Sequence, residues 1–182
     1  MQFLPLDLMG PRLVQMDPVT DHRGFNARAW CERELAEAGL EARIAQVNVI
    51  GNQRRGTLRG LHWQAHPAWE AKLFRVIRGA VYDVVVDLRP ESPTFLDWTS
   101  VELRAGEHKM LYVPAGFAQG FQTLEDDTEL MYLVSEPYSP DLGRGFRFDD
   151  PAFDIRWPLE VSEVSQKDRS WPDFQEASLD HR

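Results

Sequence analysis

The sequence predicts a mainly β fold, an antiparallel sandwich or barrel, with a jelly-roll barrel carrying a few short helices as the best candidate. Short segments rich in Val, Ile, Tyr and Leu, bounded by Gly, Pro or Asp, recur through the middle of the chain. No helix of the length that a parallel βαβ unit requires lies between them. The 182 residues, 43% of them hydrophobic, can bury one core without disulfides.

Side chains alternate between the two faces of a strand, so the pattern shows which residues of a predicted strand share a face. In Val81–Leu88, Asp83 and Asp87 share one face, which is either a wet exterior or a polar barrel lumen. The predicted strands are Lys72–Ile77, Ala80–Leu88, Ser100–Leu103, Lys109–Val113 and Leu130–Val134.

Both ends of the chain differ from this strand-rich middle. Asn26–Gly39 is the one convincing helix, because apolar residues such as Leu35 recur among charged ones and Gly39 stands at the expected stop. From about Pro140 the periodicity is weak, and we expect this tail to wrap over the barrel. The sequence contains no internal repeat, so we expect residues 1–182 to form a single domain.

Composition excludes several classes of function. Twenty Lys and Arg against 29 Asp and Glu give a net charge of -9, which disfavours broad binding to nucleic acid or an anionic membrane. An anionic substrate would therefore need a local basic pocket. The single Cys31, the absence of a signal-peptide pattern and the lack of an apolar stretch of ~20 residues predict a cytoplasmic protein.

A degenerate metal-binding pattern surrounds His62. Barrels of this shape, the cupins, often hold a metal with a Gly-x5-His-x-His segment and a later Pro-x-Gly-x-x-His. Here Gly56 precedes His62 at the right spacing, but the other histidine positions hold Gln64 and Gln119. Transition metals need three or four nitrogen, sulfur or carboxylate ligands. We therefore expect a pocket that has lost its metal and uses acid/base chemistry.

Ordered motifs over nearly the whole chain strengthen this interpretation. The chain resembles the dTDP-4-dehydrorhamnose 3,5-epimerase family. The matching segments are Arg59-Gly60-Leu61-His62-Trp63-Gln64, Lys72, Gly79 to Arg89, Ser92-Pro93-Thr94-Phe95, Pro114 to Phe121, Met131-Tyr132, Tyr138-Ser139-Pro140, Asp150-Pro151, Trp157-Pro158 and Ser165 to Asp168.

The resemblance implies a cupin-like homodimer with exchanged N-terminal strands, acting without a cofactor on a nucleotide-diphosphate 4-keto-6-deoxyhexose. A C4 ketone acidifies the hydrogens on C3 and C5, so a neutral imidazole can remove one. By the family's pattern, His62 is that base, Lys72 stabilises the enolate, and Tyr132 returns the proton. Asp168 orients the imidazole.

Further residues match substrate-binding positions. The resemblance implies that Arg23 and Arg59, with Lys167, bind the diphosphate. Asp83 is a candidate to support Lys72. The residues expected near the nucleotide or sugar are Gln46, Asn48, Gln119 and Tyr138.

Simpler explanations and departures from the family leave alternatives open. Taken singly, His62 is more often a satisfied core histidine, Lys72 a solvated strand residue and Tyr132 a core aromatic. Gln119 replaces the family's histidine and cannot be protonated, and Arg28 stands where the family has a carboxylate. Inversion at both carbons is therefore open.

Four functions follow from these observations. The first is epimerisation at C3, C5 or both. The alternatives are 3,4-ketoisomerisation of a related nucleotide sugar and non-catalytic binding of a sugar nucleotide. A metal-dependent cupin oxygenase is the weakest of the four, because Gln64 and Gln119 are poor ligands.

Overall fold

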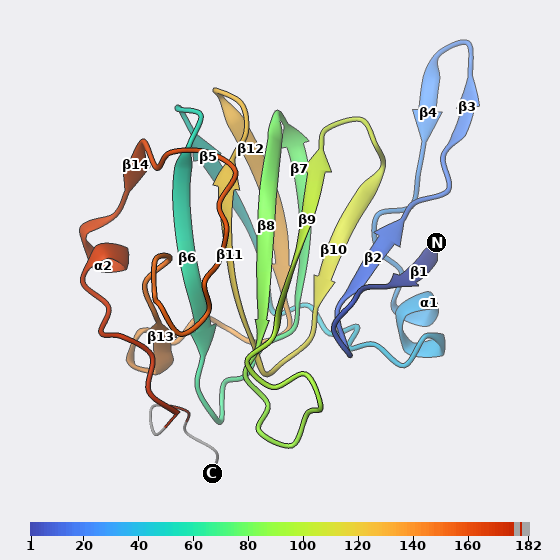
Figure 1. Ribbon diagram of the computed structural model, residues 1–182. Coiled ribbons are helices and arrows are strands. Elements are labelled where there is room, and N and C mark those ends of the chain that lie inside the picture. The colour runs from blue at the N-terminus through green and yellow to red at the C-terminus, as the bar shows by residue number, and fades with distance from the viewer. Residues whose placement is uncertain (177–178, 180–182) are drawn as a thin grey trace.

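The computed structural model describes residues 1–176 and 179, and it confirms a mainly β, cupin-like jelly roll (Figure 1). Its described residues form two six-stranded sheets and a two-stranded hairpin. The first sheet, in spatial order, contains β1 (Gln2–Pro5), β2 (Arg12–Gln15), β10 (Lys109–Val113), β7 (Lys72–Arg78), β12 (Thr128–Val134) and β5 (Gln46–Asn52).

The second sheet faces the first, and the two enclose the central core. That core includes Phe74, Val85, Leu111 and Phe121, each buried between the sheets. The second sheet contains β13 (Gly143–Gly145), β6 (Thr57–Gln64), β11 (Phe117–Thr123), β8 (Ala80–Asp87) and β9 (Trp98–Arg104), with β14 (Glu163–Val164) pairing with β6.

The five predicted strands are confirmed as β7, β8, β9, β10 and β12, with ends that differ by two residues or fewer. On β8, Asp83 and Asp87 are fully buried. Asp83 lies in the interior, and Asp87 is bound by the guanidinium of Arg89 through Nε at 2.9 Å and Nη2 at 2.7 Å. The face that Asp83 and Asp87 share is therefore the barrel lumen, and Asp87 lies at one end of it.

The outer faces of the sheets are covered by the two ends of the chain. The tail packs Phe146 and Phe153 against Leu61 and Val84 of the second sheet. The tail also contains the 3₁₀ turn η1 (Pro140–Leu142) and the helix α2 (Gln166–Arg169).

Helix α1 (Glu32–Glu37) covers the first sheet and is shorter than the predicted Asn26–Gly39. It buries Leu35 against the sheet. The prediction was wrong at its start, because β4 (Gly24–Asn26) pairs with β3 (Val19–Asp21) instead of forming a helical turn. No helix among the described residues is long and apolar enough to cross a membrane.

A bulge in β6 positions the residues that matter for function. In its pairing with β11, His62 lies opposite Gln119, whereas Arg59 already lies opposite Phe121, so the register shifts between them. Gly60 has a φ of 115°, and a Cβ there would lie 2.6 Å from the Cα of Gly120. The bulge therefore needs glycine, and it brings Arg59 and His62, three residues apart, to the same cavity.

Candidate active site

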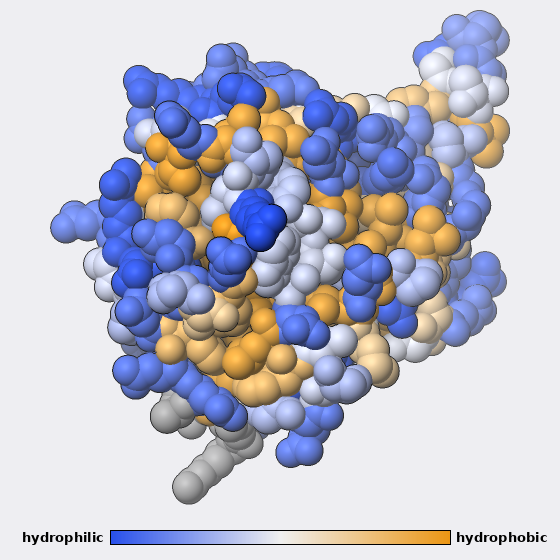
Figure 2. Space-filling view, in the orientation of Figure 1, coloured by the Kyte–Doolittle hydropathy of each residue, from blue (hydrophilic) through white to orange (hydrophobic). Residues whose placement is uncertain are grey.

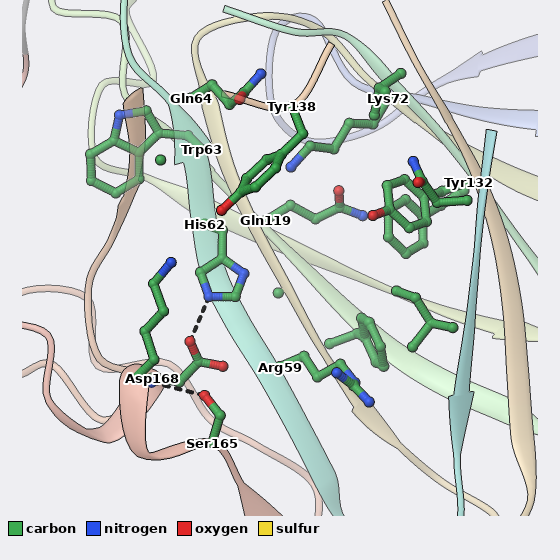
Figure 3. Close-up of a pocket in the computed structure, with 18 of the residues that line it drawn as sticks. Arg59, His62, Trp63, Gln64, Lys72, Gln119, Tyr132, Tyr138, Ser165 and Asp168 are labelled. Atoms are coloured by element: carbon green, nitrogen blue, oxygen red, sulfur yellow. Dashed lines mark hydrogen bonds and ion pairs between the residues drawn. The ribbon is translucent and has the colours of Figure 1, made fainter. Parts of the chain in front are cut away.

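A cavity of about 780 Å³ opens between the two sheets (Figure 3). The second sheet contributes His62 and Gln119, and the first contributes Lys72 and Tyr132. The other residues expected in the site that line this cavity are Gln46, Asn48, Arg59, Tyr138, Lys167 and Asp168.

His62 and Asp168 form a hydrogen-bonded pair at one wall. His62 Nε2 lies 2.6 Å from Asp168 Oδ1, and the other ring nitrogen points away from Asp168 into the cavity (Figure 3). The imidazole is 40% exposed and the carboxylate 5%. A carboxylate on one ring nitrogen fixes the tautomer, which leaves Nδ1 able to accept a proton.

The tail holds Asp168 in place. The Ser165 hydroxyl caps α2 by accepting a hydrogen bond from the Asp168 amide at 3.0 Å, and Asp168 Oδ2 accepts one from the Gly60 amide at 3.4 Å. Burial alone would raise the pKa of Asp168, but the hydrogen bond and charge of His62, with the Gly60 amide and the Ser165 hydroxyl, hold it below its ordinary value. Asp168 is therefore ionised at neutral pH.

Lys72 lies on the opposite wall with a partner that the sequence did not predict. Its Nζ lies 3.3 Å from Glu70 Oε1, and both side chains are nearly buried. Glu70 also accepts a hydrogen bond from Gln64 Nε2 at 3.1 Å. The pair places a fixed cation next to the cavity.

Tyr132 extends from β12 on the same wall as Lys72. Its ring stacks on Phe74 with centroids 4.9 Å apart. Burial raises the pKa of the phenol, and the charge of Glu70 raises it further. Tyr132 therefore keeps its proton at neutral pH and is an acid.

Cationic and amide side chains occupy the rim. Arg59 donates from Nε to Asn52 Oδ1 at 2.8 Å, which fixes its guanidinium at the end of β5. Lys167 lies over the ring of Trp171, 5.3 Å from its centroid. These cations form the local basic region that an acidic chain needs for an anionic substrate.

Gln119 lies opposite His62 on β11, with Asp83 beneath it. Gln119 Nε2 donates to both carboxylate oxygens of Asp83 at 3.0 Å. Burial raises the pKa of Asp83 to about 8, although the Gln119 hydrogen bond and the charge of Lys72 act in the other direction. Asp83 thus contacts Gln119, and its effect on Lys72 is electrostatic.

Arg23 is the one predicted binding residue that the structure does not bring to this cavity. It lies at the tip of the β3–β4 hairpin, which projects from the body with a hydrophilic tip (Figures 1 and 2). Its guanidinium contacts Asp21 at 2.5 Å and is 78% exposed. A single chain therefore leaves Arg23 outside its own site.

Comparisons with known proteins agree with this geometry. The model of the dTDP-4-dehydrorhamnose 3,5-epimerase family matches residues 5–176. The enzyme of that name from Methanothermobacter thermautotrophicus is 39% identical over 178 residues, covering 96% of this chain and 95% of that protein. The chain belongs to the dTDP-4-dehydrorhamnose 3,5-epimerase family.

Solved structures extend the comparison. A dTDP-4-dehydrorhamnose 3,5-epimerase from Bacillus anthracis, with TDP and PPi bound, superposes with a TM-score of 0.91 at 38% identity, covering 95% of this chain and 99% of that one. ChmJ, a 3'-monoepimerase from Streptomyces bikiniensis in complex with dTDP-quinovose, gives 0.85 at 35% identity, covering 92% and 85%. The name of ChmJ thus describes an enzyme that acts at one centre.

The donor set in this family member does not fit a cupin metal. His62 binds Asp168, the Gln64 amide binds Glu70, and the Gln119 amide binds Asp83. Among the described residues, no group of three or more His, Cys, Asp or Glu is placed to hold a metal ion.

Sequence reasoning missed three residues of this epimerase site. Glu70 stands two positions before Lys72, and residues two apart in an extended chain share a face, so the spacing was a usable signal. Asn52 holds Arg59 by a hydrogen bond, and this contact depends on the bulge in β6. Arg144 lines the cavity from β13, and no motif marked it.

The buried Asp83 predicts an unusual dependence of stability on pH. Its pKa is raised from 3.8 to about 8, so between these values the folded state keeps a proton that the unfolded state has lost. Stability therefore falls as pH rises through this window, by up to about 1.4 kcal/mol per pH unit from this group. Urea unfolding at pH 5 to 8 should show Asp83→Asn gaining stability relative to the parent as pH rises; a constant difference would contradict the raised pKa.

Proposed function

We propose that this protein epimerises a 4-keto-6-deoxyhexose carried on a nucleoside diphosphate, at C3, C5 or both. The observation that carries the proposal is the hydrogen-bonded His62–Asp168 pair on one wall of the cavity, with Lys72 and Tyr132 on the other. Its family membership supports the same chemistry.

Proton removal is the first step. Nδ1 of His62 takes the proton from the carbon next to the C4 carbonyl, and the C–H electron pair moves to form the enolate with its charge on the C4 oxygen. Ionised Asp168 stabilises the imidazolium that results. The charge of Lys72 stabilises the enolate oxygen, since preorganised cations act strongly in an enclosed site.

Inversion requires the proton to return to the opposite face of the sugar. His62 and Tyr132 extend from different sheets, so a sugar between the sheets meets a base on one side and an acid on the other. The phenol of Tyr132, which holds its proton at neutral pH, protonates the carbon as the C4 carbonyl re-forms. The phenolate then recovers its proton, and the imidazolium releases its own, through solvent.

The rim binds the nucleotide in this proposal. Arg59 and Lys167 bind the diphosphate, because a guanidinium and an ammonium match its charge. Gln46, Asn48 and Tyr138 lie on the same side of the cavity, where Gln46 Oε1 accepts a hydrogen bond from the Tyr138 amide. We assign these three to the nucleoside.

Solvent exchange tests the proposal. The purified protein is incubated in D2O with a nucleotide-linked 4-keto-6-deoxyglucose, and NMR follows deuterium at C3 and C5. An epimerase incorporates deuterium at one or both carbons and keeps the carbonyl at C4. A carbonyl that moves to C3 would identify a ketoisomerase instead, and binding without exchange would identify a non-catalytic protein.

We also propose a homodimer in which each hairpin reaches the partner's cavity. Arg23 lies too far out to serve its own site, and Val19 and Phe25 of the hairpin are 76% and 55% exposed. Val47 and Val49 on the outer face of β5 are 56% and 65% exposed. Burial of these apolar side chains would stabilise a dimer.

We propose a cytoplasmic location for the protein. The unpaired Cys31 is in keeping with it.

Subunit mixing tests this arrangement. Arg23→Ala and His62→Asn are each expected to impair a homodimer at low substrate concentration. After mixing and exchange of subunits, heterodimers contain one site with both intact groups, so activity should recover to about one quarter of the parent value. Light scattering should give twice the 21.0 kDa chain mass. A monomer, or a mixture without recovery, would contradict the exchange.

A further inference from the structure

Gln119 borders the reacting centre, and the steps above give it no role. It lies directly opposite His62 on the neighbouring strand and is 5% exposed at the cavity wall. Directly opposite residues of antiparallel strands have Cβ atoms about 4.5–5.5 Å apart. His62 and Gln119 line the same cavity (Figure 3), so a sugar that contacts His62 has Gln119 in the adjoining wall.

The two ends of this amide differ in their hydrogen bonding. Nε2 is bound to Asp83, whereas Oε1 is buried and has no hydrogen-bond partner among the described residues. A buried acceptor without a donor is costly. A carbonyl oxygen has two lone pairs, so Oε1 keeps a free one even if a protonated Asp83 donates to it. A turn of the side chain toward the cavity that Gln119 lines would expose Oε1 to a donor from the substrate and relieve this cost.

The two carbons that flank the C4 ketone offer different groups to that oxygen. In a 4-keto-6-deoxyhexose, C3 carries a hydroxyl and C5 carries the C6 methyl. Either carbon must approach His62 while the C4 oxygen stays on the side of Lys72. The substituent next to Gln119 is therefore a hydroxyl when C3 reacts and a methyl when C5 reacts.

We propose that Gln119 is a specificity-determining residue that directs reaction to C3 in preference to C5, because its side-chain oxygen accepts a hydrogen bond from the C3 hydroxyl. With C5 at the base, a methyl group covers the acceptor and leaves it unpaired. Sites built to bind a hydroxyl discriminate strongly against groups that lack one. This inference rests on the proposed function and deepens it.

Exchange in D2O measures the preference directly. The parent is expected to incorporate deuterium faster at C3 than at C5. Gln119→Met keeps a similar length without hydrogen bonding, and it should lower the C3 to C5 ratio by about tenfold. Gln122→Met is the matched control on the same strand, because the Gln122 amide binds the Leu159 carbonyl, outside the cavity. The ratio of C3 to C5 exchange in Gln122→Met should equal that of the parent.

A substrate lacking the C3 hydroxyl provides a second measurement that does not depend on the variant folding. The parent should bind a nucleotide-linked 4-keto-3,6-dideoxyhexose about tenfold more weakly than the hydroxylated sugar. Gln119→Met should bind the two sugars with equal affinity. The four affinities, of parent and variant for each sugar, form a double-mutant cycle between the Gln119 side chain and the C3 hydroxyl.

The outcomes separate this inference from the proposed function. A parent that exchanges neither carbon overturns the proposed function and this inference together. A parent that exchanges C5 as fast as C3, or a Gln119→Met variant with an unchanged ratio, overturns only the role of Gln119. Equal affinity of the parent for the two sugars also overturns it.

Discussion

His62→Asn is expected to reduce deuterium exchange at the reacting carbon by about 10²–10⁴-fold, the range that a positioned general base contributes. Asparagine can still donate to Asp168, but it has no nitrogen that accepts a proton at neutral pH. Substrate affinity should change little, because the diphosphate is bound at Arg59 and Lys167. The loss should therefore appear in kcat and not in KM.

The matched control for this variant is His66→Asn. His66 lies four residues further along, is exposed and does not line the cavity, so exchange should match that of the parent. Thermal unfolding of both variants checks that the fold is intact. If His62→Asn retains exchange within a few-fold of the parent, His62 is not the base.

Lys72→Gln should have the second largest effect, a loss of about 10²–10³-fold in kcat, comparable to removing one oxyanion donor. The enolate oxygen would face a neutral amide in place of a full charge. The substitution also leaves Glu70 as a buried carboxylate without its cation, so the variant should be less stable, by up to about 3 kcal/mol.

A double variant separates these two consequences. Glu70→Gln combined with Lys72→Gln removes both charges of the pair, so stability in urea should largely return. Activity should not return, because the cation that faces the substrate is still missing. Recovery of turnover together with stability would show that Lys72 has a structural role and does not stabilise the enolate.

The strands were predictable where local sequence decides them. Branched and aromatic residues between Gly79 and Pro90 predict a strand over Ala80–Leu88, within one residue of the end of β8. Strand β11 was not among the predicted strands, and its residues Ala118 and Gly120 are of types that are depleted in strands. It forms because strands pair on both of its sides and all seven of its residues are buried, so tertiary contacts override propensity.

The helix prediction failed in the opposite way, because the sequence pattern predicts a helix longer than the one that forms. Asn26–Gly39 has a helical pattern, yet only Glu32–Glu37 is helical. Asn26, the first residue of that pattern, pairs with Val19 in the β3–β4 hairpin, and residues 27–31 form neither helix nor strand. Periodicity describes what a segment could form alone, and pairing with a neighbouring segment decided what it formed.

The sequence alone determined the fold class, the family resemblance and the identity of His62 as a histidine without metal partners. Only the tertiary structure decided that Asp168, 106 residues away, binds its Nε2, and that Lys72 and Tyr132 face it from the other sheet. It also revealed Glu70 beside Lys72 and the free acceptor of Gln119. The physical reason is that strand alternation specifies which residues share a face, whereas distances across a cavity depend on how two sheets pack and where a bulge shifts the register.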